Sequence, residues 1–355
     1  MMIFRFVAYY YLKYVLIVFC GLEMFFISID SLKYVDKFPD SANLVILFFV
    51  YDALYAFNYT LPISFLLGLV IFYISMIKSN QYTALLAIGF SKKNIFKPIL
   101  IISLFFSLVM IGLNATPFVY AQEKAEAIIY QGKFSNTTED LLVKYGQDYV
   151  YFGKIFPILQ KAQNIKVFQL KNHLLVSFTQ ADTAFFQNGY WVLQNANVST
   201  LPEVFVLGKK GLDIKHLEEL KILKGFRPKI LDTIYQNKPS VSIIDAVQSL
   251  MILKNQHAGS EKIRAMIYSF VLVPFFVPFT AMIIVYYTPS LARYGNLALL
   301  SFEFIVISLV VWGLFFALGK LSISGLFLPE IGILLPLIVL VGVAFWHFNR
   351  INRRI

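Results

Sequence analysis

Apolar positions are grouped along the chain into six stretches, and polar positions lie mostly between them. A helix needs about 20 mostly apolar residues to cross the hydrocarbon core of a bilayer. The candidate spans are residues 10–32, 60–77, 96–118, 265–287, 297–319 and 331–348. The apolar run that begins before the second span is too long for one crossing and contains Asp52, Asn58 and Pro62, so we expect residues 43–57 to form a helix at the interface that leads into the second span.

The pattern changes between the third and fourth spans, where short β-rich pieces recur and Asn188-Gly189 gives a two-residue hairpin signal. The expected strands include residues 148–152, 165–170, 174–178, 190–193 and 204–207. Apolar positions then return at helical spacing after Ser242, which predicts a capped amphipathic helix. The sequence thus divides into spans one to three (1–118), an antiparallel β-domain (119–240), a connecting helix (241–263) and spans four to six (264–355).

A polar segment with helix signals, residues 80–90, separates the second span from the third. Asn80 can cap a first turn, Gly89 followed by Phe90 matches a left-handed helix stop, and Ser91 can cap the next helix. A helix of about two turns is not stable alone. The segment is therefore either a helix with a partner or an ordinary connecting loop, and on its own it favours neither.

Basic residues in the short connections collect on one side of the six spans. They are Arg5, Lys13, Lys78, Lys92, Lys93, Lys97, Arg293, Arg350, Arg353 and Arg354. Because short cytoplasmic loops carry the excess of Lys and Arg, this side is predicted to be cytoplasmic, with both termini inside. The long insertion then lies outside.

Composition agrees with an integral membrane protein, because 58% of the residues are hydrophobic and only 14% are charged. No small-residue cleavage site follows the first span, so we expect it to remain as an anchor. The excess of 31 Lys and Arg over 20 Asp and Glu suits a phosphate-rich partner or an anionic membrane surface. It does not indicate nucleic acid, since no basic stripe with interleaved aromatic residues occurs in the insertion.

Charged residues near the outer end of the first span form a predicted stripe, since Glu23, Asp30 and Lys37 are spaced by seven and Lys33 lies about one turn from Asp30. Charges in hydrocarbon are costly unless they face protein or water. Lys33 and Lys37 could border a cavity and meet the phosphates of a lipid headgroup. Alternatively, Asp30 and Lys33 could pair with each other while the lysines extend to the interface.

No recognisable catalytic or metal-binding set is present in the sequence. It contains no glycine-rich phosphate loop, so ATP hydrolysis would have to come from another subunit. The four histidines, His173, His216, His257 and His347, are far apart and do not form a ligand pair. We therefore expect no metal, no cofactor and no enzymatic activity, and His347 is most simply an interfacial residue.

The order of these elements resembles the LptF/LptG family of lipopolysaccharide export permeases, nearly from end to end. The similarity includes the segment 81–91, the run 181–193 and the pair Leu328-Pro329 and Leu335-Pro336 before the last span. Asp30 and the stretch 34–39 (Tyr-Val-Asp-Lys-Phe-Pro) are more similar to the LptG branch.

The resemblance implies six transmembrane helices and a periplasmic β-jellyroll, in a multi-pass protein of the bacterial inner membrane. Members of the family pair with a second permease and a cytoplasmic ATPase dimer to extract lipopolysaccharide from the inner membrane. The jellyroll passes the lipid to periplasmic bridge proteins that reach the outer membrane.

The resemblance also implies roles for particular residues. Lys33 and Lys37, with Asp30, would contact lipopolysaccharide, and the cytoplasmic helix would dock on the ATPase. The expected docking residues are Gln81, Tyr82, Leu85, Leu86, Gly89 and Phe90. Gln81 stands where the family commonly has Glu, and Gln can hydrogen-bond but cannot form a strong ion pair.

A different class of function fits many of the same features. A membrane-anchored sensor could bind a periplasmic ligand through its β-domain and use the spans only for signalling. The two hypotheses differ at residues 80–90, because a transport subunit should associate with an ATPase there and a sensor should not.

Overall fold

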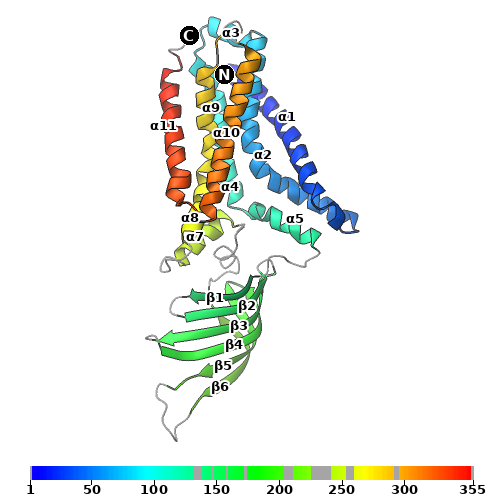
Figure 1. Cartoon of the computed structure of the whole chain (residues 1–355), viewed down its shortest axis with the longest axis vertical. Coiled ribbons are helices and arrows are strands. Elements are labelled where there is room, and N and C mark those ends of the chain that lie inside the picture. Colours follow the sequence, from blue (N-terminus) through cyan, green and yellow to red (C-terminus); the bar gives the residue numbers. More distant parts are fainter. Residues whose placement is uncertain are drawn as a thin grey trace. The chain divides into compact units, whose positions relative to one another are not determined.

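The computed structural model describes residues 2–130, 138–145, 148–156, 159–171, 174–202, 211–224, 241–252, 260–291 and 296–352. They belong to two compact units, Met1–Gln131 with Ser240–Ile355, and Gly132–Pro239. The first unit is helical and the second holds a β-sheet (Figure 1).

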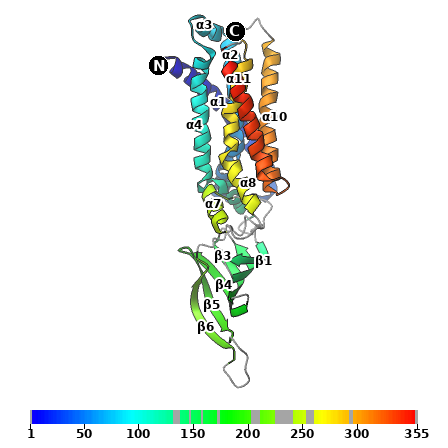
Figure 2. The ribbon, with the colours of Figure 1, turned by 90° about the vertical axis from the view of Figure 1, so that its left-hand side faces the viewer.

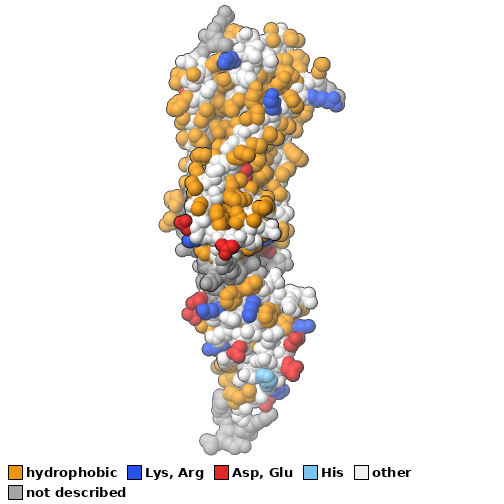
Figure 3. Space-filling view, turned by 90° about the vertical axis from the view of Figure 1, so that its right-hand side faces the viewer, with side chains coloured by type: hydrophobic (Ala, Val, Ile, Leu, Met, Phe, Trp, Pro, Cys, Tyr) orange, Lys and Arg blue, Asp and Glu red, His pale blue; other side chains and the backbone are white. Residues whose placement is uncertain are grey.

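Six helical segments among the described residues are long and apolar enough to cross a membrane, at the six places that the sequence predicts. They are α1 (Met2–Leu32), α2 (Ala42–Lys78), α4 (Lys92–Asn114), α8 with α9 (Ser260–Tyr287), α10 (Leu297–Ile323) and α11 with the π-helical turn before it (Glu330–Arg350). Figure 3 shows hydrophobic side chains covering one face of this unit, with charged side chains mainly at its two ends. The prediction of six spans and an inserted β-domain is confirmed.

The helical unit has two chemically different ends. The two termini and α3 (Gln81–Ala87) lie at one end, and α5 (Ala121–Ile129) and α7 (Ile243–Ile252) lie at the other (Figures 1 and 2). Lys78 and Lys92 flank α3, so these basic residues lie at the same end as the termini. Two of the basic residues that predict the topology are therefore grouped with the termini in the fold.

α2 is one helix of 37 residues where the sequence predicts two. Residues 43–57 are helical as expected, but they are continuous with the second span. Asp52 lies inside this continuous helix, and its side chain is buried within the unit. Pro62 lies inside α2, where it removes one backbone donor, and Figure 1 shows α2 bending along its course.

The core of the helical unit begins with close packing between α1 and α2. A Cβ atom placed on Gly68 of α2 would lie 2.8 Å from the Cα atom of Val15 on α1, so only glycine permits this approach. Tyr11 is fully buried beside the crossing and its hydroxyl donates to the Phe65 carbonyl at 3.1 Å. Burial of the tyrosine ring and a satisfied hydroxyl together fix α1 against α2.

The second half of the helical unit consists of α8 (Ser260–Val271), a 3-10 turn, η4 (Val273–Phe275), α9 (Phe276–Tyr287), α10, the π-helical turn η6 (Glu330–Leu334) and α11 (Leu335–Arg350). Arg264 of α8 and Glu330 of η6 form an ion pair at 2.9 Å. His347 of α11 is buried rather than interfacial, with Nε2 3.1 Å from the Tyr287 hydroxyl and Nδ1 2.8 Å from the Val343 carbonyl. These bonds give the ring a structural role between α9 and α11.

Polar side chains join the short 3-10 helix η2 (Pro117–Tyr120), which follows α4, to the start of α7. Tyr120 donates from its hydroxyl to the Asp245 carboxylate, and the Ser242 hydroxyl donates to the same oxygen at 2.9 Å. Ser242 also accepts from the Asp245 backbone N–H at 3.2 Å, so the predicted cap is confirmed. Burial and the bond to Asp245 raise the pKa of Tyr120, so its phenol remains a donor at neutral pH.

The described strands of the second unit form one antiparallel sheet, in the order β1-β2-β3-β4-β5-β6. The strands are β1 (Thr138–Tyr145), β2 (Asp148–Phe156), β3 (Lys161–Lys171), β4 (Leu174–Gln187), β5 (Tyr190–Thr200) and β6 (Asp213–Ile222). The predicted strand at 204–207 lies outside the described residues. Asn188 and Gly189 join β4 to β5 with positive φ angles of 51° and 82°, as a type I′ hairpin turn requires.

The core of the sheet unit is aromatic. Trp191 is fully buried, and its ring centroid lies 5.4 Å from that of Phe152 and 5.7 Å from that of Phe186. Inward and outward positions alternate along β2 and β4, which is the pattern that predicts this domain from sequence.

The Gly68 contact gives a prediction for stability. Gly68→Ala forces the new methyl group against the backbone of Val15, so we expect a loss of about 1–3 kcal/mol, as for other overpacked cores. Gly112→Ala in α4 is the matched control because nothing lies within 4 Å of its Cβ position. It should be neutral or slightly stabilising. Unfolding of the purified protein in detergent measures both, and equal stability of the two variants would contradict the close-packing argument.

Candidate functional site

Asp30, Lys33 and Lys37 lie at the end of the helical unit that also holds α5. Asp30 is in the last turn of α1, Lys33 follows the helix, and Lys37 ends the 3-10 turn η1 (Val35–Lys37). Because α1 stops at Leu32, the expected seven-residue stripe does not extend to Lys37. The stripe prediction is wrong beyond Asp30, although the three charged groups remain at one end of the unit.

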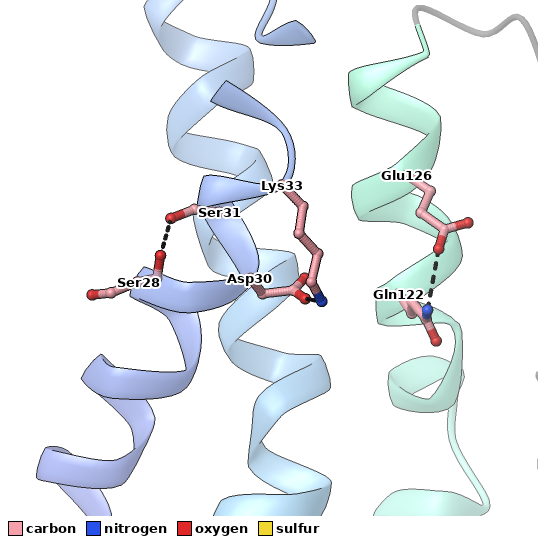
Figure 4. A network of polar contacts seen from close by, with 6 residues as sticks. All are labelled: Ser28, Asp30, Ser31, Lys33, Gln122 and Glu126. Carbon is pink, nitrogen blue, oxygen red and sulfur yellow. Dashed lines mark hydrogen bonds and ion pairs between the residues drawn. The ribbon is translucent and has the colours of Figure 1, made fainter. Parts of the chain in front are cut away.

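Each lysine of this group has a neighbour that holds its ammonium group. Lys33 forms an ion pair with Asp30 (Figure 4). The Lys33 side chain is 63% exposed and the Asp30 side chain is 15% exposed. Lys37 places its Nζ 5.3 Å from the centroid of the Tyr130 ring, which lies just after α5. The intramolecular Asp30–Lys33 pair, one of the two alternatives that the sequence left open, is thus present, and Lys33 remains accessible.

Further carboxyl groups surround the pair. Asp52 of α2 is only 2% exposed and interacts electrostatically with Asp30 and Lys33. Glu23 accepts from the Thr60 hydroxyl, and Glu126 of α5 accepts from the Gln122 amide at 3.1 Å (Figure 4). Sequence reasoning gave Asp52 little weight, and its only signal was a carboxylate within an apolar run.

Tyr34 lies close enough to several of these carboxylates to interact with them electrostatically. Burial, with the carboxylates of Glu126 and Asp30, raises the pKa of Tyr34 to about 12. Its ring also packs on Phe48 of α2, with centroids 5.6 Å apart. The connection between α1 and α2 is therefore held against both α2 and α5, with a phenol that stays protonated at neutral pH.

At the opposite end of the helical unit, α3 has one predicted boundary and one that differs from the prediction. Gly89 adopts φ +100°, its N–H donates to Leu86 O at 3.0 Å, and Phe90 N–H donates to Leu85 O at 3.1 Å. This pair of bonds is a Schellman stop, as predicted. Asn80 instead adopts a left-handed conformation and its side chain makes no cap, so that prediction is wrong.

The next helix begins as the sequence predicts. Ser91 caps α4 by accepting from the Asn94 N–H at 3.2 Å. With the Schellman stop before it, this cap fixes both sides of the turn between α3 and α4.

The inner face of α3 packs on the helical unit itself. Tyr82 is fully buried, while Leu85, Leu86 and Phe90 are half-buried against the core of the helices. Of the expected docking residues, Tyr82, Leu85 and Leu86 therefore have packing partners within the chain. Docking by Leu85 and Leu86 remains a prediction, and the complete burial of Tyr82 argues against such a role for that residue.

The outer face of α3 is formed by residues at helical spacing. The exposed residues are Gln81, Ala84, Ala87, Ile88 and Gly89. Ile88 is 74% exposed but is not among the docking residues expected from the sequence. Its position seven residues after Gln81 places both on one side of a helix, and this spacing was the available signal. A partner that contacts α3 from outside meets this face first.

A family model described as "Lipopolysaccharide export system permease LptF/LptG" matches residues 5–350 of the chain. The chain belongs to the LptF/LptG family. The match covers both the helices and the sheet unit, and it does not distinguish LptF from LptG. A search of curated proteins gave no match.

Membership makes this chain a multi-pass permease of a lipopolysaccharide export system rather than an enzyme. Within the described parts of the permease, no group of three His, Cys, Asp or Glu residues is placed to hold a metal ion. Two groups at opposite ends of the helical unit are the candidate functional sites: Asp30 with Lys33 and Lys37, and the outer face of α3.

Proposed function

We propose that this permease works with a second permease of the family and a cytoplasmic ATPase dimer to extract lipopolysaccharide from the inner membrane. It then passes the lipid through its own β-domain to periplasmic bridge proteins. The observation that carries this proposal is the family match over residues 5–350, which includes both α3 and the sheet unit.

The proposed orientation places α3 and both termini in the cytoplasm and the sheet unit in the periplasm. Its support is electrostatic, because Lys78, Lys92, Lys93 and Lys97 all lie around α3 in a short connection. On the face drawn in Figure 3, the charged side chains near that end are Lys or Arg. The lysines of the long insertion do not contradict a periplasmic location, because long segments are translocated largely regardless of their charge.

The proposed lipid contact uses Lys33 and Lys37. An ion pair as exposed as Asp30–Lys33 is worth about 0.2–1 kcal/mol. An ammonium group has three donors, so the exposed Lys33 can donate to a headgroup phosphate while it remains paired with Asp30, and a charge-assisted hydrogen bond of this kind is worth about 1.5–3 kcal/mol. Phosphates of lipopolysaccharide would meet these lysines while acyl chains pack against the apolar helices.

One experiment separates this function from that of a sensor. Affinity purification of the permease from native membranes, with identification of bound proteins and lipid, should recover an ATPase and lipopolysaccharide. The recovered complex should hydrolyse ATP faster in lipid vesicles than the ATPase alone. A permease that binds a periplasmic ligand but no ATPase would favour the sensor hypothesis.

Topology gives a direct prediction. A reporter fused after Ile355 should behave as cytoplasmic, and one inserted at the β5 residue Asn195 as periplasmic. The measurement uses paired reporters that are active on only one side of the membrane. The reverse pattern would overturn the proposed orientation.

The outer face of α3 gives a docking prediction. Ile88→Asp places a charge on the most exposed apolar position of that face, so we expect the ATPase to be lost from the purified complex while the permease stays folded. Gln81→Glu, which restores the charge common in the family, should leave assembly intact. Leu85→Asp is the contrasting variant, because it charges the inner face and should lower the stability of the permease itself. Full ATPase recovery with Ile88→Asp would remove this face as the docking surface.

Charge reversal tests the lipid contact. Replacing Lys33 and Lys37 together by Glu turns attraction into repulsion, and losing even one charge-assisted contact of about 1.5–3 kcal/mol would weaken binding by about tenfold or more. Photo-crosslinking to lipopolysaccharide should fall accordingly, while basal ATPase activity remains.

The double Ala variant is the graded control for that experiment. It removes both charges without repulsion, so its effect should be smaller and in the same direction. Unchanged crosslinking in a folded double Glu variant would mean that the lysines are structural and that the headgroup is bound elsewhere.

A further inference from the structure

We infer that Tyr82 is a positioning residue that transmits movement of α3 to α2, an inference that rests on the proposed function. Tyr82 lies on the inner face of α3, fully buried, and so cannot be a contact for an external partner. Its neighbours are instead the helices that must move if ATP hydrolysis is to act on the lipid site.

The contact between Tyr82 and α2 includes a pair of aromatic rings. The centroids of the Tyr82 and Tyr73 rings are 5.5 Å apart and the rings are perpendicular, with an interplanar angle of 88°. Neither hydroxyl has a hydrogen-bond partner among the described residues. The geometry is the edge-to-face packing that aromatic pairs prefer.

The same ring contact continues toward α1. Phe72, adjacent to Tyr73 on α2, lies with its ring centroid 6.2 Å from that of Tyr11 on α1. Phe72, Tyr73, Tyr11 and Tyr82 are all fully buried. Protein interiors are close-packed and transmit strain, so a shift of the Tyr82 ring has to be accommodated by α2 and then by α1.

Hydrogen bonds attach α3 and its flank to the other half of the helical unit. Thr83 donates from its hydroxyl to the Ser290 carbonyl at 2.8 Å. Lys92, which is buried at the start of α4, donates to the carbonyl of Thr288 at 3.3 Å. Both carbonyls belong to the chain just after α9, so α3 is joined to α2 through Tyr82 and to the end of α9 through Thr83.

The division of faces gives Tyr82 a role different from docking. Gln81, Ala84 and Ile88 are exposed and available to the ATPase, whereas Tyr82 is on the opposite side of the same two turns. The Schellman stop at Gly89 and the Ser91 cap hold this helix as one unit. A force applied to the outer face of α3 is therefore transmitted to the inner face through Tyr82, its largest buried side chain.

The test measures coupling rather than either rate alone. The full complex with its co-purified ATPase is placed in phosphatidylethanolamine and phosphatidylglycerol vesicles that contain lipopolysaccharide. A photo-crosslinking amino acid at Leu175 of β4, which is exposed, reports lipid that reaches the sheet unit. The readout is lipid crosslinked at this position per ATP hydrolysed.

Tyr82→Leu keeps an apolar side chain but loses the ring contact with Tyr73. We expect normal ATPase recovery and ATP hydrolysis, with the lipid-to-ATP ratio reduced by about fivefold or more, the lower end of usual coupling between sites. Tyr82→Phe keeps the ring and removes a hydroxyl that has no partner, so its ratio should equal that of the unmodified permease.

Phe315→Leu in α10 is the matched control, because its buried ring stacks on Phe276 of α9 with centroids 5.7 Å apart, a contact that shares no ring with the Tyr82 path. Its ratio should be unchanged even if the amount of complex falls. The inference would be overturned if Tyr82→Leu left the lipid-to-ATP ratio unchanged. This includes the case in which lipid crosslinking and ATP hydrolysis fall in proportion. If the unmodified permease recovers no ATPase or delivers no lipid on ATP addition, the proposed function itself fails, and this outcome is seen before any variant is made.

Discussion

The absence of water from the hydrocarbon core is the constraint on which the rest of this structure depends. Backbone polar groups in a bilayer must bond within the protein, so the six spans are helices and the sheet forms in the inserted unit. The same constraint acts on side chains, because a charge in hydrocarbon is costly unless it is paired. Glu23 accordingly meets Thr60, and Asp52 lies buried near Asp30 and Lys33 at one end of the unit.

The short length of α3 explains why it has two unlike faces. A helix of seven residues is too short to be stable by itself, so it needs contacts to fix it. Tyr82, with the half-buried Leu85 and Leu86, supplies these contacts from the inside. The outer face, which includes the exposed Gln81 and Ile88, is not needed for that packing.

Features set by nearby residues could be predicted from the sequence, and features set by distant ones could not. The spans, the Gly89 stop, the Ser91 and Ser242 caps and the Asn188-Gly189 turn each depend on a few adjacent positions. The continuity of α2, the packing of Leu85 and Leu86 and the Tyr120–Asp245 bond depend on partners far along the chain. At the proposed lipid site the sequence indicated the lysines, but the early end of α1 and the burial of Asp52 became clear only from the structure.

One helix connects the two candidate sites. α2 carries Tyr73 beside α3 and Asp52 beside Asp30 and Lys33, about 21 residues and therefore roughly 30 Å apart along a helix. Between them lie Pro62, where the helix loses a backbone bond, and Gly68, where α1 makes its closest approach. A rigid contact at Gly68 ties α1 to α2 on the α3 side of Pro62, while the segment beyond Pro62 packs on α5. The connection after α1 packs on that same segment, with the Tyr34 and Phe48 rings 5.6 Å apart, so movement that enters at Tyr73 would reach Asp52 and Lys33 together, along α2 and past the bend at Pro62.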